Sequence, residues 1–287
     1  MLRFLSLGSG SSGNCYYLGT ERYAILIDAG IPGRDIQRVQ RAFGLAEVPI
    51  RALLITHDHT DHIRGASMMT KVTGCPVYTT REVHDGMDKN YGLQKKVPKE
   101  CRKNLEREVP FDLPLTGFRV TPFPVPHDSH DNVGYYIEWR EDGHEEHFCL
   151  ITDAGQLTPE IVKYATLADH LVIESNYDTE MLVGGSYPNH LKQRIMDKGG
   201  HLSNDECATL LRQTWHEGLR HVFLCHLSAD NNKPELAYKA ASEALSTAGA
   251  TVGYDGVTLA TLPRWNPGQK NSLSSAGPSQ IYELDRV

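Results

Sequence analysis

The chain has 287 residues, of which 40% are hydrophobic and 23% charged, so it can bury a sizeable core as one large domain or as a core with an insertion. These values exclude a wholly disordered or a fibrous protein. With 29 basic and 36 acidic residues the net charge is −7, so bulk electrostatics does not favour nucleic acid and any phosphate recognition has to be local.

The patterning of the first half predicts short strands alternating with helices. In chain order we expect strands at 2–7, 16–19 and 23–28, a helix at 34–43, a strand at 52–55, a helix at 63–72 and an extended segment at 76–79. Residues 81–103 are polar and irregular, and we expect 81–108 to be an insertion outside the core.

A second series follows. We expect strands at 118–124, 133–139 and 147–152, weak helical character at 161–164, a strand at 171–175, a helix at 207–217, a strand at 222–227 and a helix at 235–247. Two strand-rich halves interleaved with helices predict two packed sheets with helices outside. The predicted domain is 1–262, and the Ser-, Gly- and Pro-rich segment 263–287 predicts a flexible tail or a loose surface strap.

Two features bear on the cellular compartment. No apolar run approaches the roughly 20 residues that span a bilayer, and the start lacks a basic segment followed by a long apolar stretch. We therefore expect a cytoplasmic protein with no membrane partner. The six cysteines lie far apart without a CxxC pair, which predicts free thiols rather than a disulfide framework or a zinc ribbon.

A dense cluster of imidazoles and carboxylates follows strand 52–55 directly: Thr56-His57-Asp58-His59-Thr60-Asp61-His62. In extended geometry the side chains at 57, 59 and 61 share one face. Neutral imidazole and carboxylate suit zinc and similar first-row divalent cations, so the cluster predicts a metal site. A solvated polar loop is the alternative, and it is disfavoured because a buried cluster of this kind is costly unless something ties it together.

This segment resembles the HxHxDH signature of the metallo-β-lactamase superfamily, which it matches with His57, His59, Asp61 and His62. The resemblance implies a four-layer αββα sandwich and two divalent metal ions, zinc first, with manganese or iron as alternatives. It implies that His57, His59 and a later histidine hold one metal. Asp61, His62 and a last histidine would hold the second, and a further aspartate would bridge the two.

The partners that the resemblance requires occur in the expected order as His127, Asp153 and His226. Asp153 ends a strand and would supply one oxygen to each metal, which keeps two cations roughly 3.5 to 4 Å apart. Asp28 ends an early strand and is expected to accept an imidazole N–H, which would set the tautomer of a ligand. Taken singly, such an aspartate is more often a turn or cap residue. His130 is the second choice for the position assigned to His127.

A histidine ahead of a helix points to phosphate chemistry. Ser203 and Glu206 have the spacing of a capping box, and His201 lies just before it. Helix N-terminal N–H groups favour an anion, and the imidazole would hydrogen-bond a phosphate oxygen or protonate a leaving alkoxide. The segment resembles the Gly-His-Ser-Thr region of phosphodiesterases such as tRNase Z, and Glu174 resembles the glutamate that orients that histidine. A capped helix with an exposed histidine, and a carboxylate in solvent, are the alternatives.

Four segments together are most similar to the bacterial WalJ-like (YycJ-like) subgroup: 8–14, 174–178, 200–204 and 226–232. The resemblance covers residues 1–262 and implies a DNA exonuclease acting from the 5′ end. The 72 residues between Asp153 and His226 leave no room for the extra domain of the larger β-CASP nucleases.

The expected reaction is therefore phosphodiester hydrolysis. Metals would lower the pKa of a bound water, the resulting hydroxide would attack phosphorus, and His201 would stabilise or protonate the departing group. Asp61, His201 and Glu174 are the residues expected in catalysis, DNA is the preferred polymer and RNA its near rival. The alternatives are hydrolysis of a small thioester, lactone or cyclic phosphate, and a non-enzymatic protein that keeps metals for stability. Flavodiiron-type redox chemistry is disfavoured, because that branch resembles a motif with Glu where His59 stands.

The sequence also contains candidates for further contacts with the substrate. The loop 8–14 would expose backbone N–H groups to phosphate, but it lacks the lysine of a P-loop, and a plain hairpin turn is the alternative. The candidate contacts are Ser9, Ser12, Asn14, Asn176 and Ser203. Five basic residues against one acid at 95–103 would receive a nucleic-acid backbone or form a solvated surface. Resident metal, strand polarity and oligomeric state stay open.

Overall fold

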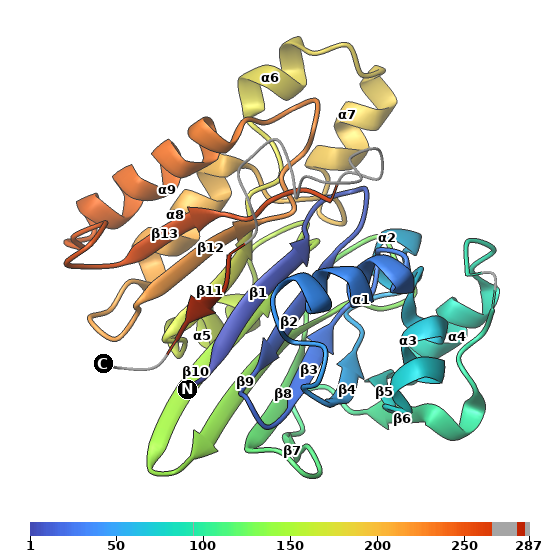
Figure 1. Ribbon diagram of the computed structural model, residues 1–287. Coiled ribbons are helices and arrows are strands. Elements are labelled where there is room, and N and C mark those ends of the chain that lie inside the picture. The colour runs from blue at the N-terminus through green and yellow to red at the C-terminus, as the bar shows by residue number, and fades with distance from the viewer. Residues whose placement is uncertain (94, 266–279, 285–287) are drawn as a thin grey trace.

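The computed structural model describes residues 1–93, 95–265 and 280–284. Within these residues two seven-stranded sheets pack face to face and helices cover both outer faces, which is the predicted αββα sandwich (Figure 1). None of the described helices is long and apolar enough to cross a membrane.

The first sheet has the order β14-β1-β2-β3-β4-β5-β6. Its strands are β1 (Arg3–Gly8), β2 (Cys15–Gly19), β3 (Ala24–Ile27), β4 (Ile50–Leu54), β5 (Val77–Thr80), β6 (Arg102–Leu105) and β14 (Tyr282–Glu283). β1 to β3 form an antiparallel meander, and β3 to β6 are parallel. Short apolar strands separated by Gly- and Ser-rich turns account for the meander.

The second sheet has the order β13-β12-β11-β10-β9-β8-β7. Its strands are β7 (Phe111–Asp112), β8 (Phe118–Pro124), β9 (Val133–Glu141), β10 (His144–Ile151), β11 (His170–Glu174), β12 (His221–Cys225) and β13 (Thr258–Thr261). β10 to β13 are parallel, and β11 and β12 are nearly continuous apolar runs because both of their faces are covered.

The helices sort into two outer layers. The described helices are α1 (Gly33–Ala42), α2 (Thr60–Ile63), α3 (Ala66–Thr73), α4 (Arg81–Lys89), the 3₁₀ turn η1 (Lys99–Cys101), α5 (Pro159–Thr166), α6 (Thr179–Gly184), α7 (Asn189–Met196), α8 (Asn204–Thr214) and α9 (Pro234–Thr247). Apolar side chains of α1, α3 and α4 pack on the first sheet, and those of α5, α8 and α9 pack on the second.

The middle layer of the core lies between the sheets. Phe4 of the first sheet has its ring centroid 5.3 Å from that of Phe148 and 4.8 Å from that of Phe223, both in the second sheet. Such aromatic contacts each bury a large apolar area, so they hold the two sheets in one relative position.

The segment expected to be an irregular insertion is instead regular in two places. The side chain of Thr80 accepts a hydrogen bond from the N–H of Val83 and begins α4, while Val83 and Met87 are buried on one face of that helix. β6 then pairs in parallel with β5. The prediction of an irregular 81–103 is wrong there, because a helix with few apolar anchors among polar residues carries a weak periodic signal.

The helix predicted at 63–72 is divided at Gly65. A Cβ atom at this position would lie 2.4 Å from the carbonyl oxygen of Ile31, so glycine lets the chain pass close to the loop after β3. α2 ends at Ile63 and α3 begins at Ala66. The pair α6 and α7 was not predicted at all.

Part of the expected tail is held in the fold. Tyr282 and Glu283 form β14, which pairs antiparallel with β1, and the buried Leu284 packs between the sheets. The carbonyl of Leu284 accepts a hydrogen bond from Arg220 Nη1 at 3.0 Å. For these residues the prediction of a flexible tail is wrong, and residues 266–279 and 285–287 lie outside the described residues.

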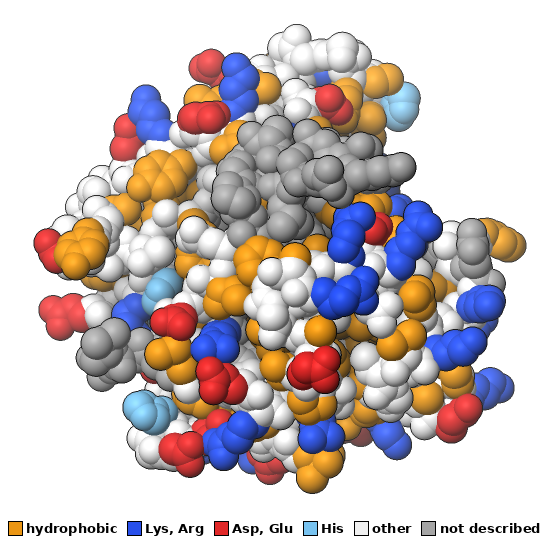
Figure 2. Space-filling view, in the orientation of Figure 1, with side chains coloured by type: hydrophobic (Ala, Val, Ile, Leu, Met, Phe, Trp, Pro, Cys, Tyr) orange, Lys and Arg blue, Asp and Glu red, His pale blue; other side chains and the backbone are white. Residues whose placement is uncertain are grey.

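Basic side chains gather on one part of the surface. Figure 2 shows Lys and Arg side chains over the α1 to α4 part of the face that it displays. The exposed residues there include Arg34, Arg38, Arg64 and Lys71. In an acidic chain this is a local positive surface.

We predict that Leu284→Ala lowers the free energy of unfolding by about 2–5 kcal/mol, because it removes a buried side chain from between the sheets. Glu283→Ala is the matched control, since its side chain is 57% exposed, and it should change stability by at most about 0.5 kcal/mol. Urea unfolding followed by circular dichroism measures both. Equal unfolding midpoints for Leu284→Ala and the wild type would show that the C-terminal strand does not contribute to the core.

Candidate metal centre and active site

Strand ends from both sheets converge on one edge of the sandwich. Asp28 follows β3 and His57 follows the parallel strand β4, while Asp153 follows β10, Glu174 ends β11 and His226 follows β12. Ligands of open α/β sheets bind outside the carboxyl ends of the strands. The alternation of apolar strand and polar loop therefore delivers side chains that are distant in sequence to one place.

The seven predicted metal ligands come together there. The donor atoms of His57, His59 and His127 lie within 4.8 Å of one another. The same holds for Asp61, His62 and His226, and for Asp153 with His57 and His62. The groups correspond to the two ligand sets and the bridging aspartate that the resemblance implied.

Asp153 lies between the two sets. Its Oδ2 is 3.2 Å from His62 Nε2, and its Oδ1 is 3.5 Å from His226 Nε2 and 3.7 Å from His127 Nε2. A carboxylate in this position reaches toward both groups of imidazoles.

The chemistry of the site fits divalent cations. Among the described residues, His57 Nε2 and His226 Nε2 are buried side-chain nitrogens without a hydrogen-bond partner. Leaving such atoms unpaired is costly, and a cation would supply the missing partner. Burial also lowers the pKa of His57 well below its usual value, which keeps the ring in the neutral form that binds metal. Mixed imidazole and carboxylate donors are compatible with zinc, manganese and iron.

Asp28 holds one of these imidazoles in place. Its Oδ2 accepts a hydrogen bond from His62 Nδ1 at 2.7 Å, and its Oδ1 accepts one from the backbone N–H of Thr56 at 2.8 Å. The expectation that Asp28 accepts an imidazole N–H is confirmed by this contact. Because Nδ1 carries the proton, Nε2 of His62 is the nitrogen with a lone pair for a metal.

Strained backbone marks the same edge. Asp28, Asp153 and His226 adopt φ values of 59°, 53° and 54°, a left-handed conformation that non-glycine residues rarely take. Such conformations persist when surrounding structure over-determines them, and they concentrate at functional sites. Here each follows a buried strand whose pairing leaves the loop little freedom.

Glu174 connects a predicted ligand to the predicted proton donor. Its Oε1 accepts hydrogen bonds from His201 Nδ1 at 2.8 Å and from His226 Nδ1 at 3.0 Å. Its Oε2 accepts from the backbone N–H groups of Ala154 and Leu202 at 2.9 and 3.1 Å. Burial alone would raise the pKa of Glu174, but the two imidazoles hold that pKa below its usual value. The structure therefore confirms the expected contact with His201 and adds one with His226.

His201 lies beside the candidate metal ligands. Its Nδ1 is 3.7 Å from Asp153 Oδ1, and the capping box of Ser203 and Glu206 is present at the start of α8. Burial opposes a charged ring here, yet Glu174 and Asp153 hold the pKa of His201 above its usual value.

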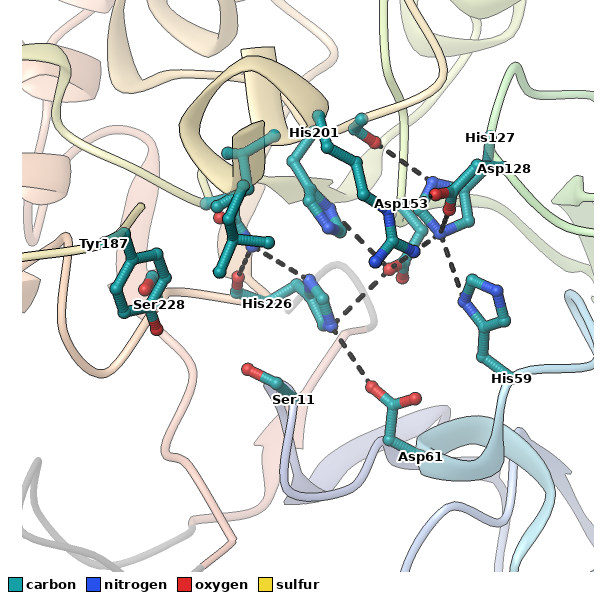
Figure 3. A pocket seen from close by; sticks show the side chains of 15 residues that line it. Ser11, His59, Asp61, His127, Asp128, Asp153, Tyr187, His201, His226 and Ser228 are labelled. Atoms are coloured by element: carbon teal, nitrogen blue, oxygen red, sulfur yellow. Dashed lines mark hydrogen bonds and ion pairs between the residues drawn. The ribbon is translucent and has the colours of Figure 1, made fainter. Parts of the chain in front are cut away.

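These side chains open into a cavity of about 250 Å³, shown in Figure 3. It is lined by Ser11, His59, Asp61, His127, Asp128, Asp153, Asn176, Tyr187, Leu191, Arg194, Ile195, Gly200, His201, His226 and Ser228. Conversely, His57, His62 and Glu174 lie behind the surface and are fully buried.

The five residues predicted as further substrate contacts lie in different places relative to the cavity. Asn176 lines the cavity and donates to the carbonyl of His226 at 2.8 Å. The hydroxyl of Ser9 accepts from the N–H of His226 and so supports that residue from behind, whereas Asn14 Nδ2 lies 2.9 Å from His62 Nε2, the nitrogen that would face a metal. Ser203 caps α8, and Ser12 is exposed outside the cavity lining.

Sequence reasoning did not name eight of the lining residues as site residues, and four of these illustrate the reasons: Ser11, Asp128, Tyr187 and Arg194. Ser11 belongs to the loop that was singled out, but the pattern could not say which serine faces the cavity. Asp128 directly follows His127. The other two belong to the segment around α7, for which no local signal existed. His130, the rival of His127, instead donates from Nδ1 to Asp58 Oδ2 at 2.8 Å.

The basic segment 95–103 lies apart from the cavity lining. Two of its five cations are occupied within the fold, since Arg102 pairs with Asp88 at 2.7 Å and Lys96 Nζ donates to the carbonyls of Met87 and Asn90.

Fold and site together define a hydrolase of the metallo-β-lactamase type, and comparison with known families agrees. Residues 23–227 match the family described as the Beta-lactamase superfamily domain, so the chain belongs to this superfamily.

Two curated relatives extend over most of the chain. The exodeoxyribonuclease YycJ of Bacillus anthracis is 31% identical over 258 residues, which cover 88% of this chain and 92% of that protein. The exodeoxyribonuclease WalJ of Streptococcus pneumoniae (strain D39) is 32% identical over 265 residues, which cover 91% of this chain and 94% of that protein.

Among solved structures, the metallo-beta-lactamase fold protein YhfI of Bacillus subtilis is similar with a TM-score of 0.64 at 16% identity, covering 99% of this chain and 100% of that one.

We predict that Gly30→Ala disrupts the loop that carries Asp61. A Cβ atom at Gly30 would lie 1.5 Å from the carbonyl oxygen of Asp61, so the backbone must move, at a cost of about 1–3 kcal/mol or more. Thermal unfolding and bound-metal analysis should both show a loss. Gly184→Ala is the matched control, because nothing lies within 4 Å of a Cβ there. Unchanged stability and metal content in Gly30→Ala would contradict the described loop packing.

We also predict that Glu174→Gln weakens zinc binding about 10- to 100-fold, since an amide cannot accept from all four donors and no longer orients His226. Chelator-competition titration measures the affinity. The exposed Glu243→Gln, on α9, serves as the control and should bind like the wild type. Wild-type affinity in Glu174→Gln would show that this carboxylate does not position a ligand.

Proposed function

We propose that this protein is a dinuclear-metal phosphodiesterase, and specifically a DNA exonuclease that acts from the 5′ end. The observation that carries the proposal is the 2.8 Å contact between His201, which lines the cavity beside predicted metal ligands, and the buried Glu174 behind it. A metal-binding edge alone would serve many hydrolytic reactions, whereas an oriented imidazole beside it suits a leaving oxygen.

The two relatives that align along about nine-tenths of the chain carry the name exodeoxyribonuclease, which supports DNA as the substrate. The local positive surface over α1 to α4 supports it as well. Arg64 of this surface donates to the carbonyl of Ser12 at 3.4 Å, next to Ser11 in the cavity lining. A phosphate chain leaving the cavity on this side would meet positive charge.

His57, His59 and His127 would hold one cation, Asp61, His62 and His226 the other, and Asp153 both. When bound, two divalent cations supply Lewis acidity toward phosphate oxygens and lower the pKa of water, with zinc the first choice and manganese or iron the alternatives.

Side chains of the protein would carry out the remaining steps of the reaction. Glu174 accepts the Nδ1 proton of His201, which directs the other ring nitrogen, Nε2, to the substrate. From Nε2 the protonated ring donates to the oxygen that leaves phosphorus, and Glu174 stabilises the charged ring. Asn176 holds the carbonyl of His226 and so keeps the loop after β12 in position.

The proposal predicts that zinc- or manganese-loaded protein shortens DNA from its 5′ end. Oligonucleotides labelled at the 5′ or 3′ end distinguish the direction. Asp61→Ala should lose activity with reduced metal content, and His201→Ala should keep its metal and lose about 10²- to 10⁴-fold in kcat. His144→Ala, on the exposed hairpin between β9 and β10, should behave like the wild type.

Several outcomes would contradict parts of the proposal. Full activity in His201→Ala would remove its role at the leaving group. If the protein cleaves RNA faster than DNA, RNA is the preferred substrate and the proposal of a DNA exonuclease is wrong. Turnover of a thioester, lactone or cyclic phosphate by metal-loaded protein that leaves all DNA and RNA intact would replace the nuclease by a small-molecule hydrolase.

A further inference from the structure

One wall of the cavity comes from α7 and from Tyr187, two residues before the helix begins. Tyr187, Leu191, Arg194 and Ile195 line the cavity, and we call these four residues the α7 wall. The spacing of 191, 194 and 195 places their side chains on one face of the helix. No residue of α7 is fully buried, so Leu191 and Ile195 do not serve the hydrophobic core. Apolar side chains that face a polar catalytic cavity instead of a core indicate a surface for a ligand.

The α7 wall is fixed relative to the predicted catalytic histidine. The backbone N–H of His201 donates to the carbonyl of Ile195 at 2.9 Å, and that of Gly200 donates to Asp197 at 2.7 Å. A Cβ atom at Gly200 would lie 2.1 Å from the carbonyl oxygen of Ile195, so this close approach requires glycine. The end of α7 and the start of the His201 segment therefore move together.

Further contacts hold the other end. Lys192 Nζ donates to the carbonyls of Val183 and Gly185, each at 2.7 Å, and so joins α7 to α6. The hydroxyl of Tyr187 donates to Asp230 Oδ2 at 2.7 Å. A pinned ring offers a contact surface without losing much conformational entropy when a ligand binds.

Arg194 adds positive charge at this wall. Its Nε donates to Asp128 Oδ2 at 2.6 Å, while the two side chains are 63% and 35% exposed. Within the described part of the chain this is the one ion pair of the guanidinium, so further N–H donors of a group with five are free for an anion. Arginine presents those donors in a planar fork that matches phosphate.

We propose that the α7 wall binds the terminal nucleotide of the DNA substrate, with Tyr187, Leu191 and Ile195 against its base and sugar and Arg194 on the adjacent phosphate. The assignment rests on the proposed nuclease function and adds to it the residues that hold the strand end. A cavity of about 250 Å³ is close to the lower limit of about 300 Å³ for small-molecule pockets, so it suits one nucleotide rather than a run of them.

The chemistry of the wall also predicts how the base is read. Aromatic and aliphatic surfaces contact any base through its face and present few groups that discriminate base edges. The α7 wall would therefore support removal of nucleotides with little dependence on sequence. A nuclease that digests strands from their ends needs this tolerance.

The base contact is tested with the double variant Leu191→Ala/Ile195→Ala. We expect kcat/KM to fall about tenfold on an oligonucleotide with an ordinary terminal nucleotide, mainly through KM, and to match the wild type on one with an abasic terminal position. Gln193→Ala/Met196→Ala is the matched control, because both residues are exposed and neither lines the cavity. Equal losses on both substrates, or no loss on the ordinary one, would overturn the base contact.

The phosphate contact is tested with Arg194→Ala. We expect kcat/KM to fall about tenfold, and the slope of its logarithm against the logarithm of salt concentration to decrease by about 1. A neutral methylphosphonate in place of the first internucleotide phosphate is not hydrolysed at that linkage, so an oligonucleotide with this change is used as a competitive inhibitor, and its inhibition constant should be the same for Arg194→Ala and the wild type. Lys239→Ala, on the distant helix α9, controls for the loss of one positive charge. An unchanged salt slope would overturn the role of Arg194.

The proposed nuclease function and the proposed role of the α7 wall are distinguished by different experimental outcomes. If the wild type cleaves DNA and the wall variants act on both members of each oligonucleotide pair like their controls, the α7 wall is not the nucleotide site and the nuclease proposal stands. If the metal-loaded wild type cleaves no nucleic acid, the proposed function and the α7 wall assignment fail together. Thermal unfolding confirms that each variant is folded before it is assayed.

Discussion

The site depends on one buried carboxylate. Glu174 is fully buried and accepts four hydrogen bonds, two from imidazoles and two from backbone N–H groups. These donors belong to the loop after β10, the segment that leads into α8 and the loop after β12, so a single side chain sets the relative positions of three chain segments. A buried charge would be prohibitive without such partners. Here the charge is also what orients a predicted metal ligand and the predicted proton donor.

The first sheet uses the same device for another ligand of the same metal position, because His62 and His226 belong to one predicted set. Asp28 is buried, accepts from His62 and from the N–H of Thr56, and thereby ties the loop after β3 to the loop after β4. Asp28 and Glu174 thus act as positioning residues in the two halves of the sandwich. The aromatic contacts of Phe4 with Phe148 and Phe223 hold those halves together, so the ligand sets meet at a constant separation.

The predicted metal ligands and the proposed nucleotide-binding wall come from different kinds of structure. Predicted ligands lie at the ends of buried strands, where pairing leaves little freedom and where Asp28, Asp153 and His226 take left-handed conformations. The α7 wall comes from helices placed between β11 and α8, which pack little of their surface in the core. Rigid strand ends suit atoms that must be placed accurately, whereas exposed helices can vary without cost to the core.

The sequence by itself determined the fold class and pointed to the candidate ligands, because the HxHxDH segment, the strand-end aspartates and the capping box are local patterns whose geometry follows from a few neighbouring residues. It also led to the contacts of Asp28 and Glu174 with imidazoles, although not to the bond between Glu174 and His226. The tertiary structure alone decided that Ser11 faces the cavity, that Ser9 supports His226 from behind and that Asn14 contacts His62. The tertiary structure alone also placed the α7 wall. It added two strands to the first sheet that the sequence did not predict, namely β6, which follows α4, and β14. These outcomes depend on which distant backbone segments approach one another, such as Gly30 against Asp61 and Gly200 against Ile195, and no local period in the sequence carries that information.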